Sequence, residues 1–202
     1  MPRLAGSREK HRKDRLPVRP GPERVSAARP PAEIRKSKPK TQKPYTVSIS
    51  NRQRLLPVDR RRLVRLVEAV LTLEQVARAE LSVAIVDDGE IHDVNRRFLG
   101  HDYPTDVISF LLDSATITKD RGAAGRTIRR GAGKRIDGEI VISAETARRW
   151  SVRFGNSPER ELELYLVHGL LHLCGYDDLT PREKRLMRRR EAEALAACVK
   201  TA

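Results

Sequence analysis

The stretch Ser157–Asp178, SPERELELYLVHGLLHLCGYDD, contains the strongest structural signals in the chain. Ser157 is a typical N-cap residue and Pro158 suits the first helical position, so we predict a helix that begins at Pro158. Around its two histidines this helix is apolar, which favours burial. Gly175 is the residue type expected just after a helix end, because glycine adopts the left-handed backbone conformation without strain. The stretch therefore predicts a buried helix, Pro158–Cys174, followed by a sharp turn.

Hydrophobic periodicity predicts further elements on the N-terminal and C-terminal sides of this helix. We expect strands at Tyr45–Ser50, Leu81–Val86, Thr105–Leu112 and Gly138–Ser143, and helices at Asp59–Gln75, Glu90–Phe98, Ala144–Phe154 and Thr180–Cys198. Leu81–Val86 is almost continuously apolar, which is typical of a central strand buried on both faces. The order of elements predicts an α+β fold, a small mixed sheet of about four strands packed with about five helices.

Charge is distributed unevenly along the 202 residues, whose formal net charge is +14. Residues 1–44 hold 14 Lys and Arg, 4 acidic residues and 8 of the 12 prolines, without apolar periodicity. We expect this segment to be a disordered, basic, proline-rich arm, with a solvated tail that has no partner as the alternative. Its prolines break the amphipathic helix that a mitochondrial presequence needs. Residues 45–202 are expected to form the folded domain.

A second basic segment is the stretch 114–135, with seven Lys and Arg, one acid and four glycines. We predict a long loop inserted in a hairpin, and either a functional role or a flexible insertion without a role accounts for it. The sequence pI near 10.4 favours a polyanionic partner, nucleic acid before membrane. No stretch approaches the ~20 apolar residues of a membrane span, and two cysteines fit a reducing compartment. We expect a cytoplasmic protein with no secretory signal and no membrane partner.

His168 and His172 stand four residues apart on the predicted helix, so their imidazoles share one face. A carboxylate of the following turn, from Asp177 or Asp178, completes an open three-ligand site of the kind that catalytic zinc uses. Two hydrogen-bonded core histidines are the alternative. Gly169 stands where the zinc peptidase helix has its glutamate base, which argues against proteolysis.

The segment HGLLHLCGYDD resembles the histidine signature of the YbeY family. Two more blocks resemble the family in the same order, NRRFLGHDYPTDVISF from Asn95 to Phe110 and DGEIVIS from Asp137 to Ser143. The resemblance covers about residues 45–197. It implies a fold with a zincin-like metal-site helix and a metal-dependent, single-strand-directed endoribonuclease. Family members act in ribosomal RNA maturation, at the 16S 3′ end, and in ribosome quality control.

The resemblance also implies the functional residues. The expected metal-binding and catalytic residues are His168, His172 and Asp178, which hold one zinc ion or another divalent metal. The RNA-binding candidates are basic residues of this chain that do not belong to the family motif, namely Arg96, Arg97, Arg129 and Arg130. The implied partners are single-stranded or ribosomal RNA and the small ribosomal subunit.

The chain departs from the family pattern at two positions. Asp178 replaces the family's third histidine, and Leu99 replaces an arginine that the family commonly has. A non-catalytic ribosome-assembly factor with a structural metal therefore remains an alternative, as does another metal-dependent hydrolase.

Several residues near the predicted metal site are expected to have supporting roles. Thr105, Asp106 and Ser109 are expected in the cleft floor by resemblance alone. Asp177 either orients a ligand imidazole or caps the turn, and Tyr176 is expected to pack. Glu139 matches a family acid or is a solvated strand residue.

Overall fold

The computed structural model describes residues 43–117 and 129–199. The chain divides into two units, Met1–Lys40 and Thr41–Ala202, and all the described residues belong to the second. The expected arm, Met1–Pro44, lies outside the described residues except for Lys43 and Pro44. So do residues 118–128 of the predicted basic insertion.

The described residues form four strands and five helices, which confirms the predicted α+β class and the predicted order of elements. In chain order these are β1 Tyr45–Asn51, α1 Arg60–Leu73, β2 Arg78–Val86, α2 Asp88–Leu99, β3 Val107–Thr116, β4 Lys134–Ser143, α3 Ala144–Phe154, α4 Pro158–Cys174 and α5 Pro181–Val199. None of the helices within the described residues is long and apolar enough to cross a membrane.

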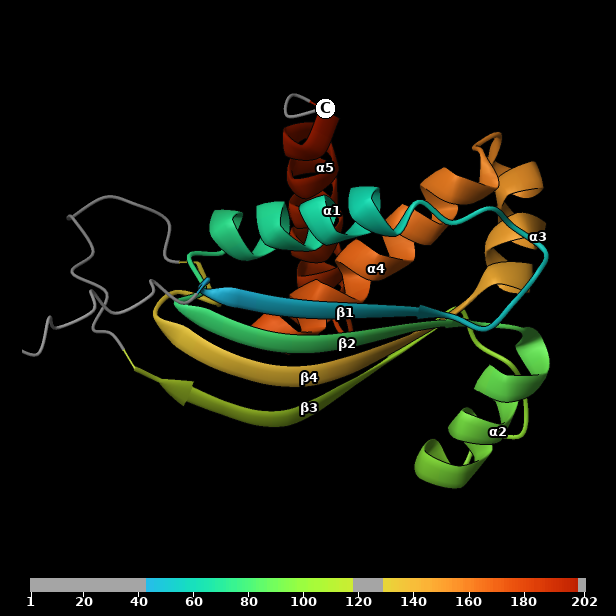
Figure 1. The fold of residues 1–202 in the computed structure, drawn as a ribbon, viewed down its shortest axis with the longest axis horizontal. Coiled ribbons are helices and arrows are strands. Elements are labelled where there is room, and N and C mark those ends of the chain that lie inside the picture. The colour runs from blue at the N-terminus through green and yellow to red at the C-terminus, as the bar shows by residue number, and fades with distance from the viewer. Residues whose placement is uncertain (1–42, 118–128, 200–202) are drawn as a thin grey trace, which may run out of the picture. The chain divides into compact units, whose positions relative to one another are not determined.

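The sheet is mixed, with strand order β1-β2-β4-β3. The pairs β1–β2 and β2–β4 are parallel, and β3 pairs antiparallel to β4 at the edge. α1, α4 and α5 lie over one face of this sheet (Figure 1). The main core fills the space between sheet and helices with fully buried aliphatic side chains, among them Leu66, Ile85, Ile140 and Leu166. α4 lies on β3 and β4 and also contacts α1, α3 and α5, which explains why most of its residues are buried.

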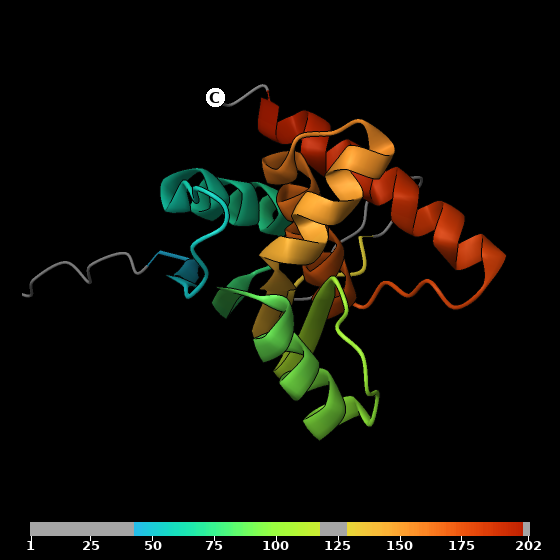
Figure 2. The ribbon, with the colours of Figure 1, turned by 90° about the vertical axis from the view of Figure 1, so that its right-hand side faces the viewer.

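The opposite face of the sheet carries no such helical layer in the described structure. α2 extends away from the other helices at one end of this face (Figure 2). β2 is a central strand as predicted, but the prediction that it is buried on both faces is wrong. Ser82 and Ala84 are only half-buried and line a cavity of about 530 Å³, together with Phe98, Phe110 and Glu139. The apolar run therefore reflects one buried face and a second face of small residues.

The hairpin insertion is shorter than the sequence predicts. β3 continues to Thr116 and β4 begins at Lys134, so both ends of the predicted loop 114–135 are paired strand. Periodicity could not reveal this extension, because β3 is exposed from Leu111 onward and backbone hydrogen bonds alone continue the ladder. A register shift between Leu111 and Asp113 marks the point where the strand leaves the core.

Capping residues fix the helix ends as the sequence predicts. The side chains of Ser143 and Ser157 accept hydrogen bonds from Thr146 N and Arg160 N at the starts of α3 and α4. α4 ends at Gly175, whose φ of 101° is the left-handed conformation that glycine adopts without strain. Gly175 N donates to the His172 carbonyl, and the chain turns sharply beneath the histidines.

Candidate metal centre

The two histidines of α4 face each other. His168 Nε2 and His172 Nε2 lie 2.9 Å apart, and the ring centroids are 4.5 Å apart at an interplanar angle of 81°. Both side chains are partly exposed, at 25% and 31%, so solvent reaches the pair. One turn of helix therefore brings two imidazole nitrogens together at the surface of an otherwise buried helix.

The other nitrogen of each ring has an acceptor. His168 Nδ1 lies 2.7 Å from Glu191 Oε1 of α5, and His172 Nδ1 lies 3.1 Å from the carbonyl oxygen of Tyr176. A carboxylate and a carbonyl can only accept, so both Nδ1 atoms carry protons. In two neutral rings the Nε2 lone pairs then point at one another, which is unfavourable unless a cation or a proton lies between them. This arrangement fits a shared metal ion, and two nitrogen ligands of tetrahedral zinc stand ~3.3 Å apart.

Asp178 lies close to the pair without completing it. Its Oδ1 is 3.9 Å from His172 Nε2, and its side chain is 40% exposed. Among the residues that the structure describes, no three His, Cys, Asp or Glu side chains form a complete metal site. Asp178 is therefore the carboxylate recorded beside His172 Nε2, which makes it the candidate for a third ligand. The donor set of two imidazoles and one carboxylate suits zinc and other divalent metals.

Charge around His168 favours its protonated form. Burial lowers the pKa of His168, but the hydrogen bond and charge of Glu191, with the charges of Asp106 and Asp178, outweigh burial and raise the pKa overall. The same negative field that favours an imidazolium favours a bound cation. The site is therefore electrostatically prepared for positive charge between its two rings.

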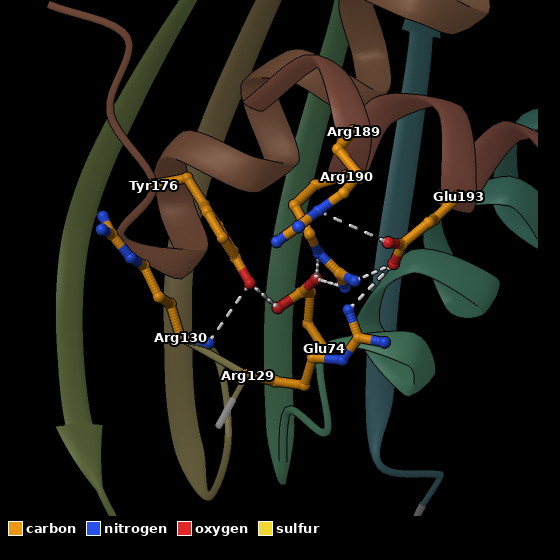
Figure 3. A network of polar contacts seen from close by, with 7 residues as sticks. All are labelled: Glu74, Arg129, Arg130, Tyr176, Arg189, Arg190 and Glu193. Carbon is orange, nitrogen blue, oxygen red and sulfur yellow. Dashed lines mark hydrogen bonds and ion pairs between the residues drawn. The ribbon is translucent and has the colours of Figure 1, made fainter. Parts of the chain in front are cut away.

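The turn after α4 is held by the β3–β4 hairpin and by Glu74, the residue that follows α1. Lys134 Nζ donates to the Cys174 carbonyl at 2.9 Å, and an Arg130 guanidinium nitrogen donates to the Gly175 carbonyl at 2.7 Å. Tyr176 is buried, and its hydroxyl donates to the fully buried Glu74 at 2.9 Å (Figure 3). Tyr176 thus packs as predicted, and its fixed backbone presents the carbonyl that binds His172.

Gly169 lies where α4 approaches the sheet most closely. A Cβ atom there would stand 2.8 Å from Ser109 Oγ and 3.1 Å from Ile140 Cγ2. A side chain at this position has no room, so the glutamate base of the zinc peptidase helix is excluded by packing as well as by sequence.

The remaining predicted residues take varied places. Asp177 accepts from Asp178 N at 2.7 Å, which matches the predicted turn cap rather than the orienting role. Ser109 packs beneath Gly169, and Asp106 acts on His168 through its charge. Glu139 lies exposed on the open face of the sheet. Leu99 is half-exposed at the end of α2.

The predicted RNA-binding arginines form two separate groups. Arg96 and Arg97 belong to the last turn of α2, where Arg96 pairs with Asp93 at 3.0 Å. Arg129 and Arg130 lie beside Tyr176, next to the turn that carries Asp178. The structure therefore puts only the second pair in contact with the metal-site turn.

Glu191 is the residue of the candidate site that the sequence alone did not indicate. It is 23 residues from His168, on a helix whose packing against α4 the sequence does not specify. One signal was available, since a metal-binding histidine nearly always needs an acceptor for its other nitrogen, and Glu191 is an acid within the arginine-rich run RRREAE.

Fold and site together define an α+β protein with a helical histidine pair whose free nitrogens converge. The family model described as Endoribonuclease YbeY matches residues 48–199. Endoribonuclease YbeY of Pelotomaculum thermopropionicum is 38% identical over 153 residues, which cover 74% of this chain and 94% of that protein. Endoribonuclease YbeY of Chloroflexus aggregans is 40% identical over 144 residues, 70% of this chain and 89% of that protein. The chain belongs to the YbeY endoribonuclease family, which confirms the resemblance.

A solved structure is also similar. The solution structure of TM1509 from Thermotoga maritima matches with a TM-score of 0.49 and 22% identity, covering 76% of this chain and 89% of that one. At this score it adds nothing to the family assignment.

Proposed function

We propose that this protein is a metal-dependent endoribonuclease that cuts single-stranded RNA during ribosomal RNA maturation in the cytoplasm. Family membership supports the reaction type and does not favour the non-catalytic assembly factor. Zinc, the small ribosomal subunit as partner, and the identity of the ligands are parts of the proposal. The observation that carries it is the 2.9 Å approach of two Nε2 atoms whose rings are both anchored through Nδ1.

His168, His172 and Asp178 are the residues that would hold the ion. When bound, a divalent metal supplies a water of lowered pKa and polarises a phosphate oxygen. Glu191 holds the proton of His168 on Nδ1, and the Tyr176 carbonyl does the same for His172, so both Nε2 atoms remain lone-pair donors. Arginines beside the turn attract the negatively charged RNA backbone and stabilise the negative charge that develops on the phosphate during cleavage.

Metal content tests the ligand assignment. We expect the purified chain to carry about one transition-metal ion, as in other three-ligand sites. The double variant His168→Ala/His172→Ala should carry none. His101→Ala is the matched control, because His101 is an exposed histidine that stacks on Tyr103 instead. Stoichiometric metal retained by the double variant would overturn the site.

Cleavage tests the reaction. Wild-type protein should cut a single-stranded RNA in a reaction that a chelator stops and added metal restores, and it should leave a duplex of the same sequence intact. Asp178→His tests the third position, because an imidazole can take the carboxylate's place as ligand. If neither protein cuts single-stranded RNA in the presence of metal, the nuclease proposal fails.

A further inference from the structure

A cavity of about 260 Å³ lies beside the metal-site turn, and Tyr176, whose carbonyl binds His172, belongs to its lining. Its lining is dominated by guanidinium groups. These come from the end of the hairpin and from α5, and they are Arg129, Arg130, Arg189 and Arg190 (Figure 3). The Tyr176 ring lies between two of them, with Arg130 Cζ 5.1 Å and Arg190 Cζ 5.8 Å from the ring centroid.

The carboxylates around this cavity do not balance its arginines. Glu74 is fully buried and its two oxygens are taken by Arg190 and by the Tyr176 hydroxyl. Among the described residues, Glu193 is then the one acid in the lining, and it is shared by three guanidiniums: it pairs with Arg190, with Arg129 at 3.1 Å and with Arg189 at 3.8 Å. Four arginines against two carboxylates leave a local excess of two positive charges.

The excess charge is available to a ligand. Arg189 stands beyond hydrogen-bonding distance of Glu193, and its side chain is 64% exposed. Arg130 is exposed and uses one guanidinium nitrogen for the Gly175 carbonyl, which leaves further N–H donors of its planar fork. Planar forks of this kind match the oxygens of a phosphate group, often in pairs.

The position of the cavity indicates which kind of phosphate it would bind. Tyr176 forms its wall, and the backbone carbonyl of the same residue binds His172. An RNA strand that crosses the metal site therefore passes within reach of the cavity. Such a strand carries a phosphate at every nucleotide, so one of its phosphates can lie at the cavity. An acidic peptide also carries negative charge, but the adjacency to a site for phosphodiester cleavage favours RNA.

We propose that this arginine pocket binds a backbone phosphate of the RNA substrate next to the scissile one. The inference rests on the proposed function for the identity of the strand. It also gives roles to Arg189 and Arg190 of α5, since Arg189 contacts the phosphate while Arg190, paired with the buried Glu74, supports the pocket.

Binding of the full-length protein to a single-stranded RNA of about 12 nucleotides, measured by fluorescence anisotropy from low to moderate salt, tests the proposal. Arg189→Gln should weaken binding roughly 3- to 10-fold and reduce the salt slope by about 1, because one phosphate contact is lost. Arg65→Gln is the matched control, since it removes the same charge from the exposed face of α1 and should leave the salt slope nearly unchanged. An Arg189→Gln protein that behaves like the control overturns the proposal.

A second variant predicts a change of opposite sign. Glu193→Gln removes the carboxylate that competes with the ligand for three guanidiniums, so RNA affinity should rise roughly 2- to 5-fold. Weaker RNA binding by a Glu193→Gln protein of unchanged Tm overturns the proposal, and if its Tm falls, the Arg189→Gln comparison alone decides. Weaker acidic-peptide binding by the Arg189→Gln protein, with RNA binding unchanged, also overturns it.

The outcomes separate this proposal from the nuclease proposal. Chelator-sensitive RNA cleavage with no effect of Arg189→Gln on RNA binding leaves the nuclease and removes the pocket. RNA binding that Arg189→Gln weakens, without RNA cleavage in the presence of any metal, leaves the pocket and removes the nuclease.

Discussion

Glu191 provides the most direct test of the metal centre. It contacts Nδ1 of His168 and does not contact Nε2, the atom that would bind the metal. Its carboxylate lies 2.7 Å from His168 Nδ1, and the two side chains are only 14% and 25% exposed, so solvent screens their interaction weakly. Carboxylates that orient a metal-binding histidine are worth roughly 10- to 100-fold in metal affinity. The low exposure favours the upper part of this range for loss of the whole interaction.

Two substitutions at this position should give a graded loss of metal affinity. In Glu191→Gln an amide oxygen still accepts the Nδ1 proton and only the charge is lost, so zinc should bind about 10-fold more weakly, a change of about 1.4 kcal/mol. In Glu191→Ala the acceptor is lost too, and the loss should approach about 100-fold. The assay is competition for zinc against a chromophoric chelator, with Glu80→Gln, an exposed acid on β2, as control. Affinities of both Glu191 variants within twofold of wild type would refute the orienting role.

The same pair has a pH signature in metal-free protein. The folded-state pKa of His168 is raised above its ordinary value of 6.5, so the contact stabilises the fold fully below the unfolded-state pKa. That contribution is lost as pH rises through the raised folded-state pKa. With chelator present, Glu191→Gln should therefore lower Tm at pH ~6 and have little effect at pH ~9. An equal loss of Tm at both pH values would contradict the charge-based account.

Three further predictions concern the packing around the site. Gly169→Ala should destabilise the fold by about 1–3 kcal/mol, because the new methyl group meets Ile140 at 3.1 Å; an unchanged urea midpoint would contradict this. Tyr176→Phe deprives the fully buried Glu74 of one donor and should cost about 1–3 kcal/mol, whereas a loss below measurement error in urea unfolding would mean that Glu74 needs no second donor. Burial raises the pKa of the Cys174 thiol to about 12, so native protein at pH 8 should resist alkylation there; rapid native-state labelling of its peptide, read by mass spectrometry, would refute this.

Local signals in the sequence were sufficient for most of the fold. The N-caps Ser143 and Ser157 and the glycine at 175 act through residues within four positions of themselves, so the helix ends that they define could be read directly. The spacing of His168 and His172 likewise needed only helical geometry. Beyond the core, β3 continues through backbone pairing with β4. Its own residues carry no pattern that predicts this pairing, so the sequence did not predict its extension to Thr116.

The contacts that orient the site join residues that are distant in sequence, so local sequence patterns could not predict them. Glu74 and Arg190 are 116 residues apart, and each is a charged residue that composition alone would assign to the surface. They are buried because each neutralises the other, with the Tyr176 hydroxyl as a further donor to the carboxylate. A pairing of this kind exists only once α1, α5 and the turn after α4 are assembled, so no pattern within one segment predicts it.

Gly169 joins the fold to the chemistry. From sequence, it meant that a peptidase base is missing between the histidines. In the structure, the absence of a side chain lets α4 approach Ser109 of β3 and Ile140 of β4 closely, and this approach fixes the position of the helix that carries both imidazoles. A glutamate introduced at 169 would push the helix away from the sheet before it could serve as a base. The site therefore cannot be converted into a peptidase by restoring that one residue, and the helix position that presents the two histidines depends on the glycine between them.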